Sequence, residues 1–230
     1  MQVLVFDIWG DFGHFKKFYT TSSPLTFSIP PPTSIFGMIG AVLGLDKNVY
    51  LKYINANTSD IAIQIINPVK KTRITLNYID TKENFTKIKN RTQIRTEFLK
   101  NPHYRLYINL KDESLFRELK EKIQEGKNFY TLSLGLANLI SNFRYVGLYE
   151  IQPLPQSDYV NTVILNENIE SIEITEGKRY FKEKIPLDME ENRIVRSYKD
   201  VVMELKGDSI EGRFKNVYKV ENKIISFLKP

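Results

Sequence analysis

The sequence predicts an α+β fold, in which a β-α-β-β-α-β unit carries an inserted two-stranded arm and precedes a β-rich segment. Three observations support this prediction. Strand-like apolar runs alternate with two helical stretches up to about residue 151. Residues 70–79 and 91–97 alternate polar and apolar side chains, and short strand-like runs with glycine turns follow residue 155. The order of the first unit is typical of a ferredoxin-like (RRM-like) domain, a four-stranded antiparallel sheet with two helices on one face.

The first strand, first helix and second strand are predicted near the start of the chain. Residues 2–8 and 61–66 are apolar, β-prone runs of the kind that form buried strands. Between them we expect a helix over residues 34–45, with Thr33 or Ser34 as its N-cap, because three prolines directly precede it.

The third strand, second helix and fourth strand follow the arm. Residues 104–110 and 143–151 are strand-like, and residues 112–125 place their apolar side chains on one helical face. Asp112 can accept hydrogen bonds from the free N–H groups at the start of this helix, and Gly126 is suited to end it. These two residues therefore predict the limits of the helix.

The arm is predicted from its alternation and its charge. Residues 70–79 and 91–97 alternate with a period of two, and a polar, turn-like stretch joins them. Residues 70–105 hold ten lysines and arginines and three acids, whereas the rest of the chain has a net charge of about −1. A concentrated basic patch attracts a polyanion, although a solvated lysine-rich loop is the simpler alternative.

The last part of the chain is predicted to be β-rich, with its boundary at Pro153 and Pro155. The chain then divides into a ferredoxin-like domain of residues 1–152, with the arm inserted at about residues 70–100, and a segment of residues 153–230. The strands expected in this segment are residues 162–165, 171–175, 178–185, 194–205 and 217–226.

The composition excludes several kinds of site. The 230 residues include no cysteine, so the chain has neither a disulfide framework nor a thiolate metal site. It has two histidines far apart in sequence and no Walker or dinucleotide-binding motif, so we expect no metal and no cofactor. There is no signal-peptide pattern and no long apolar run, which predicts a cytoplasmic protein without membrane contact.

The segment between the first strand and the first helix is the most informative one. Residues 9–19 interleave five aromatic residues with two lysines and a histidine. A connection inside an ordinary core does not need this composition. A site for single-stranded nucleic acid does, because aromatic rings stack bases and lysines bind phosphates.

A series of short motifs runs in order along about two-thirds of the chain. They are Phe6-Asp7-Ile8, Gly10, His14-Phe15-Lys16-Lys17-Phe18-Tyr19, Ser22-Ser23, Pro31, Thr33, Gly37, Ile39-Gly40-Ala41, Leu43-Gly44-Leu45, Arg91-Thr92-Gln93-Ile94, Phe98-Leu99, Asn101-Pro102, Tyr104-Arg105 and Leu134-Gly135-Leu136-Ala137-Asn138. Together these motifs resemble those of the CRISPR-associated RAMP proteins of the Cas-five family.

The resemblance implies a non-catalytic, RNA-binding subunit of a type I CRISPR surveillance complex (Cascade), most like type I-B. Such a subunit caps the 5′ handle of the CRISPR RNA (crRNA), contacts the backbone and large subunits, and takes part indirectly in antiviral targeting of DNA. The residues assigned to RNA are His14, Phe15, Phe18 and Tyr19 for base stacking, Lys16 and Lys17 for phosphates, Lys70, Lys71, Arg73, Arg91, Gln93 and Arg95 on the arm, and Ser133 and Asn138 in a glycine-containing loop.

Glycines mark two further places. Gly37, Gly40 and Gly44 fall on roughly one face of the first helix, where each costs about 1 kcal/mol relative to alanine. Either close helix packing or the close approach of a phosphate could offset this cost, and the sequence leaves both open. Residues 132–139, which contain Gly135, occupy the place of the RNA-facing glycine loop in the family that the chain resembles.

A metal-independent endoribonuclease that processes CRISPR repeat RNA is the alternative function. Such cleavage needs a base for the 2′-hydroxyl and an acid for the leaving oxygen, roles that His, Lys and Tyr can fill. The sequence offers two sets of these residues, namely His14 with Lys17 and Tyr19, and Lys100 with His103 and Tyr104. A generic RNA-binding protein outside CRISPR systems is the third hypothesis.

Overall fold

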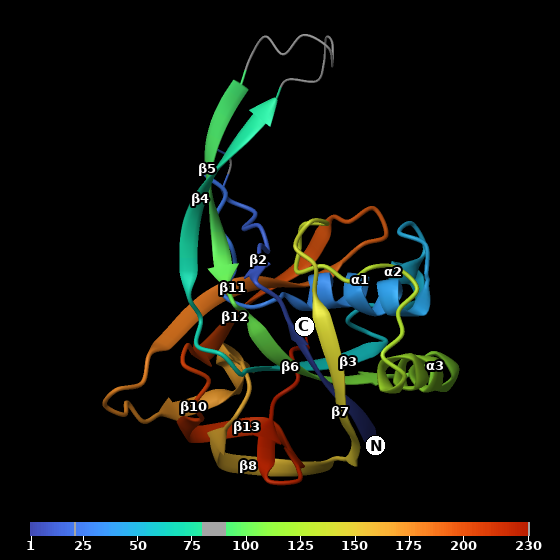
Figure 1. Cartoon of the computed structure of the whole chain (residues 1–230). Helices are drawn as coiled ribbons and strands as arrows, with labels where there is room; N and C mark the ends of the chain where they lie inside the picture. Colours follow the sequence, from blue (N-terminus) through green and yellow to red (C-terminus); the bar gives the residue numbers. More distant parts are fainter. Residues whose placement is uncertain (21, 80–90, 230) are drawn as a thin grey trace.

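The computed structural model describes residues 1–20, 22–79 and 91–229. Among these residues, four strands form an antiparallel sheet in the spatial order β3-β6-β1-β7 (Figure 1). The strands are β1 (Gln2–Trp9), β3 (Ser59–Ile65), β6 (His103–Leu110) and β7 (Asn142–Glu150). The sequence predicts all four, with limits that differ from the observed ones by only one or two residues.

Two helices cover one face of this sheet. α1 (Pro32–Leu43) and α3 (Glu113–Gln124) pack against each other, and α3 also contacts β6 and β7. Ile39 of α1 and Leu119 of α3 belong to the same buried cluster as Ile8 of β1. No helix in the described ranges is long and apolar enough to span a membrane.

α3 has the limits that the sequence predicts. The Asp112 carboxylate accepts hydrogen bonds from the N–H groups of Ser114 and Leu115 at 2.9 and 3.1 Å. These bonds satisfy N–H groups that have no partner inside the helix. Gly126, just beyond the end of the helix, has a φ of +66°, a conformation that glycine adopts without strain.

α1 begins earlier than the sequence predicts. The expected N-cap at Thr33 or Ser34 is wrong, because Pro31 is the N-cap and Pro32 is the first helical residue. Proline is favoured at this position, since its fixed φ suits the helix and its missing N–H would have had no partner there. The helix ends before Gly44, whose φ of +80° is left-handed.

β4 (Lys71–Ile79) and β5 (Arg91–Lys100) form an antiparallel pair that extends away from the rest of the molecule (Figure 1). At the base of the pair, the short strand β2 (Phe12–Gly13) adds to β5. The sequence alternation therefore predicted both strands, although β5 is longer than expected. The turn predicted between them, at residues 80–90, lies outside the described residues.

The C-terminal part consists of two further sheets. One has the order β10-β13-β14, with β8 also paired to β13, and the other has the order β11-β12-β9. The bounds are β8 (Gln152–Val160), β9 (Ile164–Leu165), β10 (Ile169–Ile172), β11 (Tyr180–Met189), β12 (Val195–Glu204), β13 (Ile210–Val220) and β14 (Lys223–Ile225), with a short 3-10 helix at Asn166–Asn168.

Several C-terminal elements differ from the expected ones, and β8 is a strand that the sequence did not predict. Pro153 and Pro155, predicted to mark a boundary, lie inside β8, which pairs with β13. Prolines are tolerated at the edge of a sheet, where one side of the strand needs no ladder hydrogen bonds. The strand expected at residues 217–226 is the end of β13 followed by β14, and Glu221 makes the turn between them with a φ of +50°.

One hydrophobic core crosses the predicted boundary at residues 152/153. Leu4 of β1 and Ile39 of α1 belong to the same buried cluster as Ile185 of β11 and Val201 of β12. The short helix α2 (Tyr50–Tyr53) also contributes to this cluster and packs against α1. The division of the chain into two parts remains a prediction.

Candidate nucleic-acid interface

The aromatic-basic loop (residues 10–20 and 22–28) folds back on itself before α1. The N–H of Phe15 donates to the hydroxyl of Thr26 at 2.9 Å, and Lys16 lies opposite Thr26 in an antiparallel β-bridge. Successive side chains of an extended backbone point to opposite sides. Phe15 is therefore buried in the core, whereas Lys16 is exposed.

Two aromatic residues lie at the far end of this loop. Phe18 and Tyr19 are 53% and 58% exposed, and their rings meet edge to face with centroids 5.0 Å apart. Phe18 also contacts the ring of Tyr198 on β12, at a centroid distance of 4.5 Å. Of the four rings that the sequence assigns to base stacking, these two present open surface.

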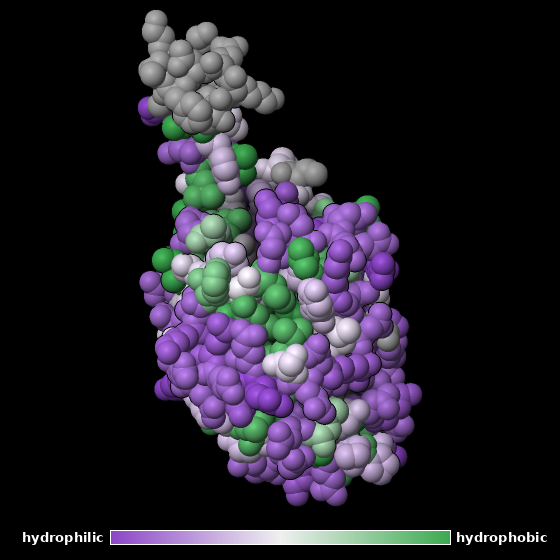
Figure 2. Space-filling view, turned by 90° about the vertical axis from the view of Figure 1, so that its right-hand side faces the viewer, coloured by the Kyte–Doolittle hydropathy of each residue, from purple (hydrophilic) through white to green (hydrophobic). Residues whose placement is uncertain are grey.

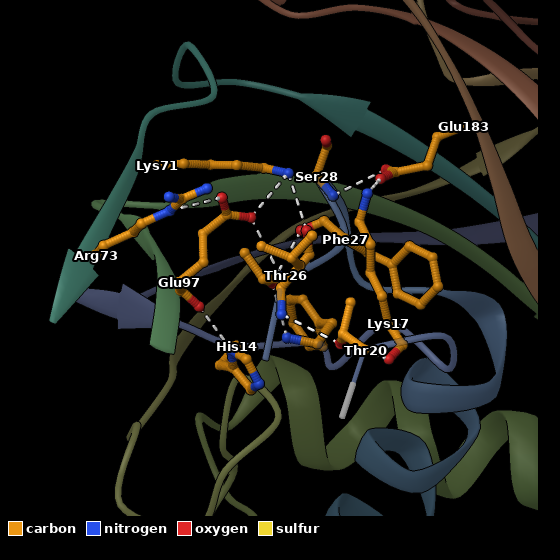
Figure 3. Close-up of polar contacts among 12 residues, drawn as sticks. His14, Lys17, Thr20, Thr26, Phe27, Ser28, Lys71, Arg73, Glu97 and Glu183 are labelled. Carbon is orange, nitrogen blue, oxygen red and sulfur yellow. Dashed lines mark hydrogen bonds and ion pairs between the residues drawn. The ribbon is translucent and has the colours of Figure 1, made fainter. Parts of the chain in front are cut away.

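Glu97 of β5 fixes the loop to the base of the β4–β5 pair. Its N–H donates to the carbonyl of Pro24 at 2.9 Å, and its own carbonyl accepts a hydrogen bond from His14 Nδ1 at 2.7 Å. Its side-chain Oε1 accepts from the N–H of Thr26 at 3.3 Å (Figure 3). One residue therefore holds both sides of the loop.

Two of the predicted RNA-binding cations face the same carboxylate. Lys71 Nζ lies 3.5 Å from Glu97 and donates to the carbonyl of Thr26 at 2.9 Å, while Arg73 Nε is 4.0 Å from Glu97 (Figure 3). Burial lowers the pKa of Lys71, and the nearby carboxylates oppose that shift. Lys71 therefore acts as a bridge between β4 and the loop.

A second carboxylate, Glu183 of β11, holds the loop from the other side. It is 5% exposed, lies 2.5 Å from Lys17 Nζ and accepts a hydrogen bond from the N–H of Ser28 at 2.9 Å (Figure 3). Burial disfavours the charge on Lys17, but the bond and the charge of Glu183 outweigh it and raise the pKa of Lys17. The sequence assigned Lys17 to phosphate, whereas the structure gives its ammonium group an internal partner.

The glycine-containing loop is built against the aromatic-basic loop. The N–H of His14 donates to the carbonyl of Leu134 at 2.8 Å. The next residue, Gly135, has a φ of +101°, and a Cβ there would lie 1.9 Å from the carbonyl oxygen of His14. Only glycine fits this contact without displacement of one of the two loops.

Three segments that are distant in sequence line one open cavity of about 300 Å³. The aromatic-basic loop contributes His14 and Lys16, the β4–β5 pair contributes Tyr78, and the glycine-containing loop contributes Gly135 and Leu136. The remaining lining residues are Phe15, Pro24, Ser34 and Thr96. The three segments singled out in the sequence therefore meet at one place.

A larger cavity of about 650 Å³ continues along α1 from the same place, because both cavities are lined by Ser34 and Gly135. Its apolar lining includes Met38, Ala41 and Leu45. Figure 2 shows hydrophobic surface gathered in the middle of the side of the molecule on which the helices lie.

The glycines of α1 have different roles. A Cβ at Gly40 would lie 3.0 Å from Tyr50 Cβ, and a Cβ at Gly44 would lie 2.7 Å from the ring of Phe129. These two glycines therefore serve close packing. Gly37 lines the larger cavity, where the one described atom within 4 Å of an added Cβ is the Tyr50 hydroxyl oxygen, at 3.9 Å.

The β4–β5 pair presents different chemistry on its two faces. Directly opposed residues of an antiparallel pair share a face, so Arg73, Gln93 and Arg95, together with Arg91, lie on one face. Tyr78 and Thr96 lie on the other face and line the smaller cavity. The sequence selected the basic face, and it missed Thr96 because a single buried threonine in a strand gives no local signal.

The remaining predicted RNA contacts lie near the site. Lys70 and Asn138 are exposed, and Ser133 is half-buried and lines the larger cavity. Sequence reasoning also missed Glu97 and Glu183. An isolated acid in a strand gives no sign that its carboxylate will accept hydrogen bonds from N–H groups far away in the sequence.

The two sets of residues considered for RNA cleavage have different surroundings. In the first, His14 bonds to Glu97 and Lys17 pairs with Glu183, while Tyr19 points outward at the loop end. In the second, Lys100 is exposed at the end of β5, and the neighbours His103 and Tyr104 in β6 point to opposite faces of the sheet. Tyr104 is 1% exposed, its hydroxyl donates to the carbonyl of Ser28 at 2.7 Å, and burial raises its pKa.

Within the part of the chain that the structure describes, no three His, Asp or Glu side chains gather into a metal-binding group.

A family model described as "CRISPR-associated protein (Cas_Cas5)" matches residues 3–200 of the chain. Among solved structures, the chain is similar to a "CRISPR RNA-guided surveillance complex" chain at 9% identity and a TM-score of 0.56, covering 89% of this chain and 90% of that one. A CRISPR protein from Archaeoglobus fulgidus is similar at 12% identity and a TM-score of 0.56, with 98% of each chain covered.

A chain of a Type III-B Cmr-beta complex bound to cognate target RNA is similar at 13% identity and a TM-score of 0.51, covering 100% of this chain and 99% of that one. At these identities, the structural likeness shows a shared fold. The comparison with curated proteins found no match.

We expect Gly135→Ala to destabilise the protein, because the new Cβ would overlap the His14 carbonyl and the backbone is left-handed. Gly177→Ala is the matched control, since Gly177 has a φ of +82° but no described atom within 4 Å of the added Cβ. Both variants carry the cost of a left-handed backbone, about 1–2 kcal/mol, so their difference measures the overlap with the His14 carbonyl. Gly135→Ala should therefore lose at least about 1 kcal/mol more free energy of unfolding than the control in urea denaturation. Equal losses would contradict the packing of the two loops.

We expect His14 to make stability depend on pH below 6.5. Burial lowers the pKa of His14 from 6.5, so below pH 6.5 the unfolded chain binds this proton more readily than the folded one. The loss of folding stability grows by up to about 1.4 kcal/mol per pH unit and levels off below the lower, folded-state pKa. Denaturation midpoints measured one unit above and one unit below pH 6.5 should therefore differ more for wild type than for His14→Gln. Equal differences in the two proteins would show that His14 is not the source of the pH dependence.

Proposed function

Because the chain belongs to the CRISPR-associated Cas5 family, we propose that it is a non-catalytic subunit of an RNA-guided CRISPR complex that binds the 5′ handle of the crRNA. Similarity in fold to a chain of an RNA-guided surveillance complex and to a chain of a target-bound Cmr complex supports membership of such an assembly. The 5′ handle is the specific part of the proposal. It comes from the family resemblance, and the geometry of the loops supports a site for unpaired RNA.

The observation that carries the proposal is the smaller cavity, where the three segments meet. Its rim combines a stacking surface, the ring of Tyr78, with an exposed cation, Lys16, and a hydroxyl, Ser34. An unpaired nucleotide needs these groups, because its base stacks on a ring and its phosphate binds a cation or a hydroxyl. The Glu97 bonds hold the loop in place before RNA arrives, which lowers the entropy cost of binding.

The exposed side chains around this cavity could bind the remaining nucleotides of the guide RNA and the neighbouring subunits. Phe18 and Tyr19 offer open rings at the loop end, and Arg91, Gln93 and Arg95 form a polar face on β5. In this proposal the β4–β5 pair is the arm that lies across the guide RNA and the neighbouring backbone subunit. In this proposal, the chain contacts the large subunit once the complex has assembled, and it contributes to target DNA binding only indirectly, through that subunit.

The finer assignments belong to the same proposal. The strand order β3-β6-β1-β7 with α1 and α3 on one face fits a ferredoxin-like RAMP domain that ends near residue 152. The complex would be of type I and most like type I-B.

The geometry favours binding over RNA cleavage. Lys17 has a raised pKa and a buried carboxylate partner, which are poor properties for a group that must take up a proton. Tyr104 is buried, and its hydroxyl donates a hydrogen bond to the carbonyl of Ser28, away from His103. These two observations support the non-catalytic role.

We expect Tyr78→Ala to weaken binding of RNA that carries the 5′ handle by about 1–3 kcal/mol, the usual value of one base–aromatic stack. Fluorescence anisotropy of labelled handle RNA at fixed salt measures this loss. Tyr159→Ala is the matched control, because Tyr159 is also an exposed tyrosine on a strand, 39% exposed on β8.

Equal affinity of the two variants would contradict the role of the cavity. The same RNA incubated with wild type in EDTA should remain intact on a denaturing gel. A discrete cut would instead establish the endoribonuclease.

A further inference from the structure

In the part of the chain that the structure describes, C-terminal residues pack on one end of the sheet face turned away from α1 and α3. Val3 and Val5 of β1 are buried there against Ile225 of β14 and Phe227. Alternate residues of a strand share a face, so the side chain of Asp7 follows these two valines on the same side of β1. Trp9, at the end of β1, follows Asp7.

Asp7 lies in a row of charged residues across three strands. The register places it opposite Arg105 of β6 and opposite Arg144 of β7. Arg105 makes two bonds to the Asp7 carboxylate, at 2.7 and 3.1 Å, whereas the closest approach of Arg144 is 3.5 Å. The Arg144 side chain is 68% exposed, and the carboxylate beneath it is 1% exposed.

Trp9 lies in the next row. It is opposite His103 of β6 and Asn142 of β7. The rings of Trp9 and His103 are 5.6 Å apart between centroids, and the guanidinium carbon of Arg144 lies 5.9 Å from the indole centre. A cation at this distance from an indole face is attracted to it.

The row contains more positive charge than the fold needs. Burial disfavours the charge on Asp7, but the bonds and charge of Arg105, with His103 nearby, keep the pKa of Asp7 below its usual value. Arg105 alone satisfies the ionised carboxylate in a bidentate pair. Arg144 adds a second guanidinium, mostly in solvent, where an ion pair contributes little to stability.

We propose that this end of the sheet is a second site for single-stranded nucleic acid, in which a base stacks on Trp9 and His103 and the adjoining phosphate binds Arg144 and Arg105. β1 and β6, which carry the two rings, are the central strands of the sheet. Four-stranded sheets that present aromatic rings in this way stack unpaired bases. The site is separate from the cavity proposed for the handle, which lies on the side of α1.

The site contains its own optical probe, because Trp9 is the one tryptophan in the chain. Titration of the full-length protein with a short oligouridylate should quench tryptophan fluorescence with saturation, since stacking on the indole quenches its emission. Arg144→Gln should raise the midpoint of this quenching roughly tenfold through loss of a charge-assisted phosphate contact. Its exposed side chain can be replaced without leaving a buried charge unpaired.

Arg117→Gln, which replaces another exposed arginine, on α3, is the matched control and should titrate like wild type. The affinity for labelled handle RNA, measured by anisotropy, should be the same for Arg144→Gln and wild type. A result against the second site can therefore be told apart from a result against the handle site. Saturated oligouridylate binding without quenching, or equal midpoints for Arg144→Gln and wild type, would overturn the proposal. Quenching by polyglutamate but not by oligouridylate would also overturn it, in favour of an acidic protein partner.

Discussion

Two carboxylates, Glu97 and Glu183, fix the loop on which the candidate RNA site depends. Glu97 meets the loop at its backbone N–H, its backbone carbonyl and its side chain, and Glu183 neutralises Lys17 while it accepts the N–H of Ser28. A polar loop held by buried charge-assisted bonds keeps one conformation, since any other would leave charges without partners. The position of the exposed Lys16 and of the cavity around His14 follows from this constraint.

The fold uses its positive charge in two ways. Lys17 and Lys71 are turned inward, where they join the loop to β11 and β4. Arg91, Arg95 and Arg144 are turned outward and have no comparable structural task in the contacts that the structure describes. Each inward lysine is matched by a carboxylate, so these pairs add nothing to the overall charge of +6, and the outward-facing cations mark two separate surfaces.

The elements were predictable where a local pattern encodes them. The Asp112 cap, the period of two at residues 70–79 and the apolar runs of the central sheet identified α3, β4 and the four strands. The start of α1 was misplaced because proline was treated as a barrier when it suits the first turn. The contact between Ser28 and Glu183 joins residues 155 positions apart, and no local pattern can encode it. Local sequence alone could not show that Lys17 turns inward and Lys16 outward.

Hydrogen exchange of the loop amides tests the central claim most directly. In wild type, the N–H groups of Phe15, Lys17 and Phe27 are bonded within the loop and should exchange slowly. Glu183→Gln removes the charge that pairs with Lys17, so these amides should exchange faster, while those of β1 and β6 keep their protection. Unchanged protection of the three loop amides in Glu183→Gln would contradict the claim that buried carboxylates hold the loop in place.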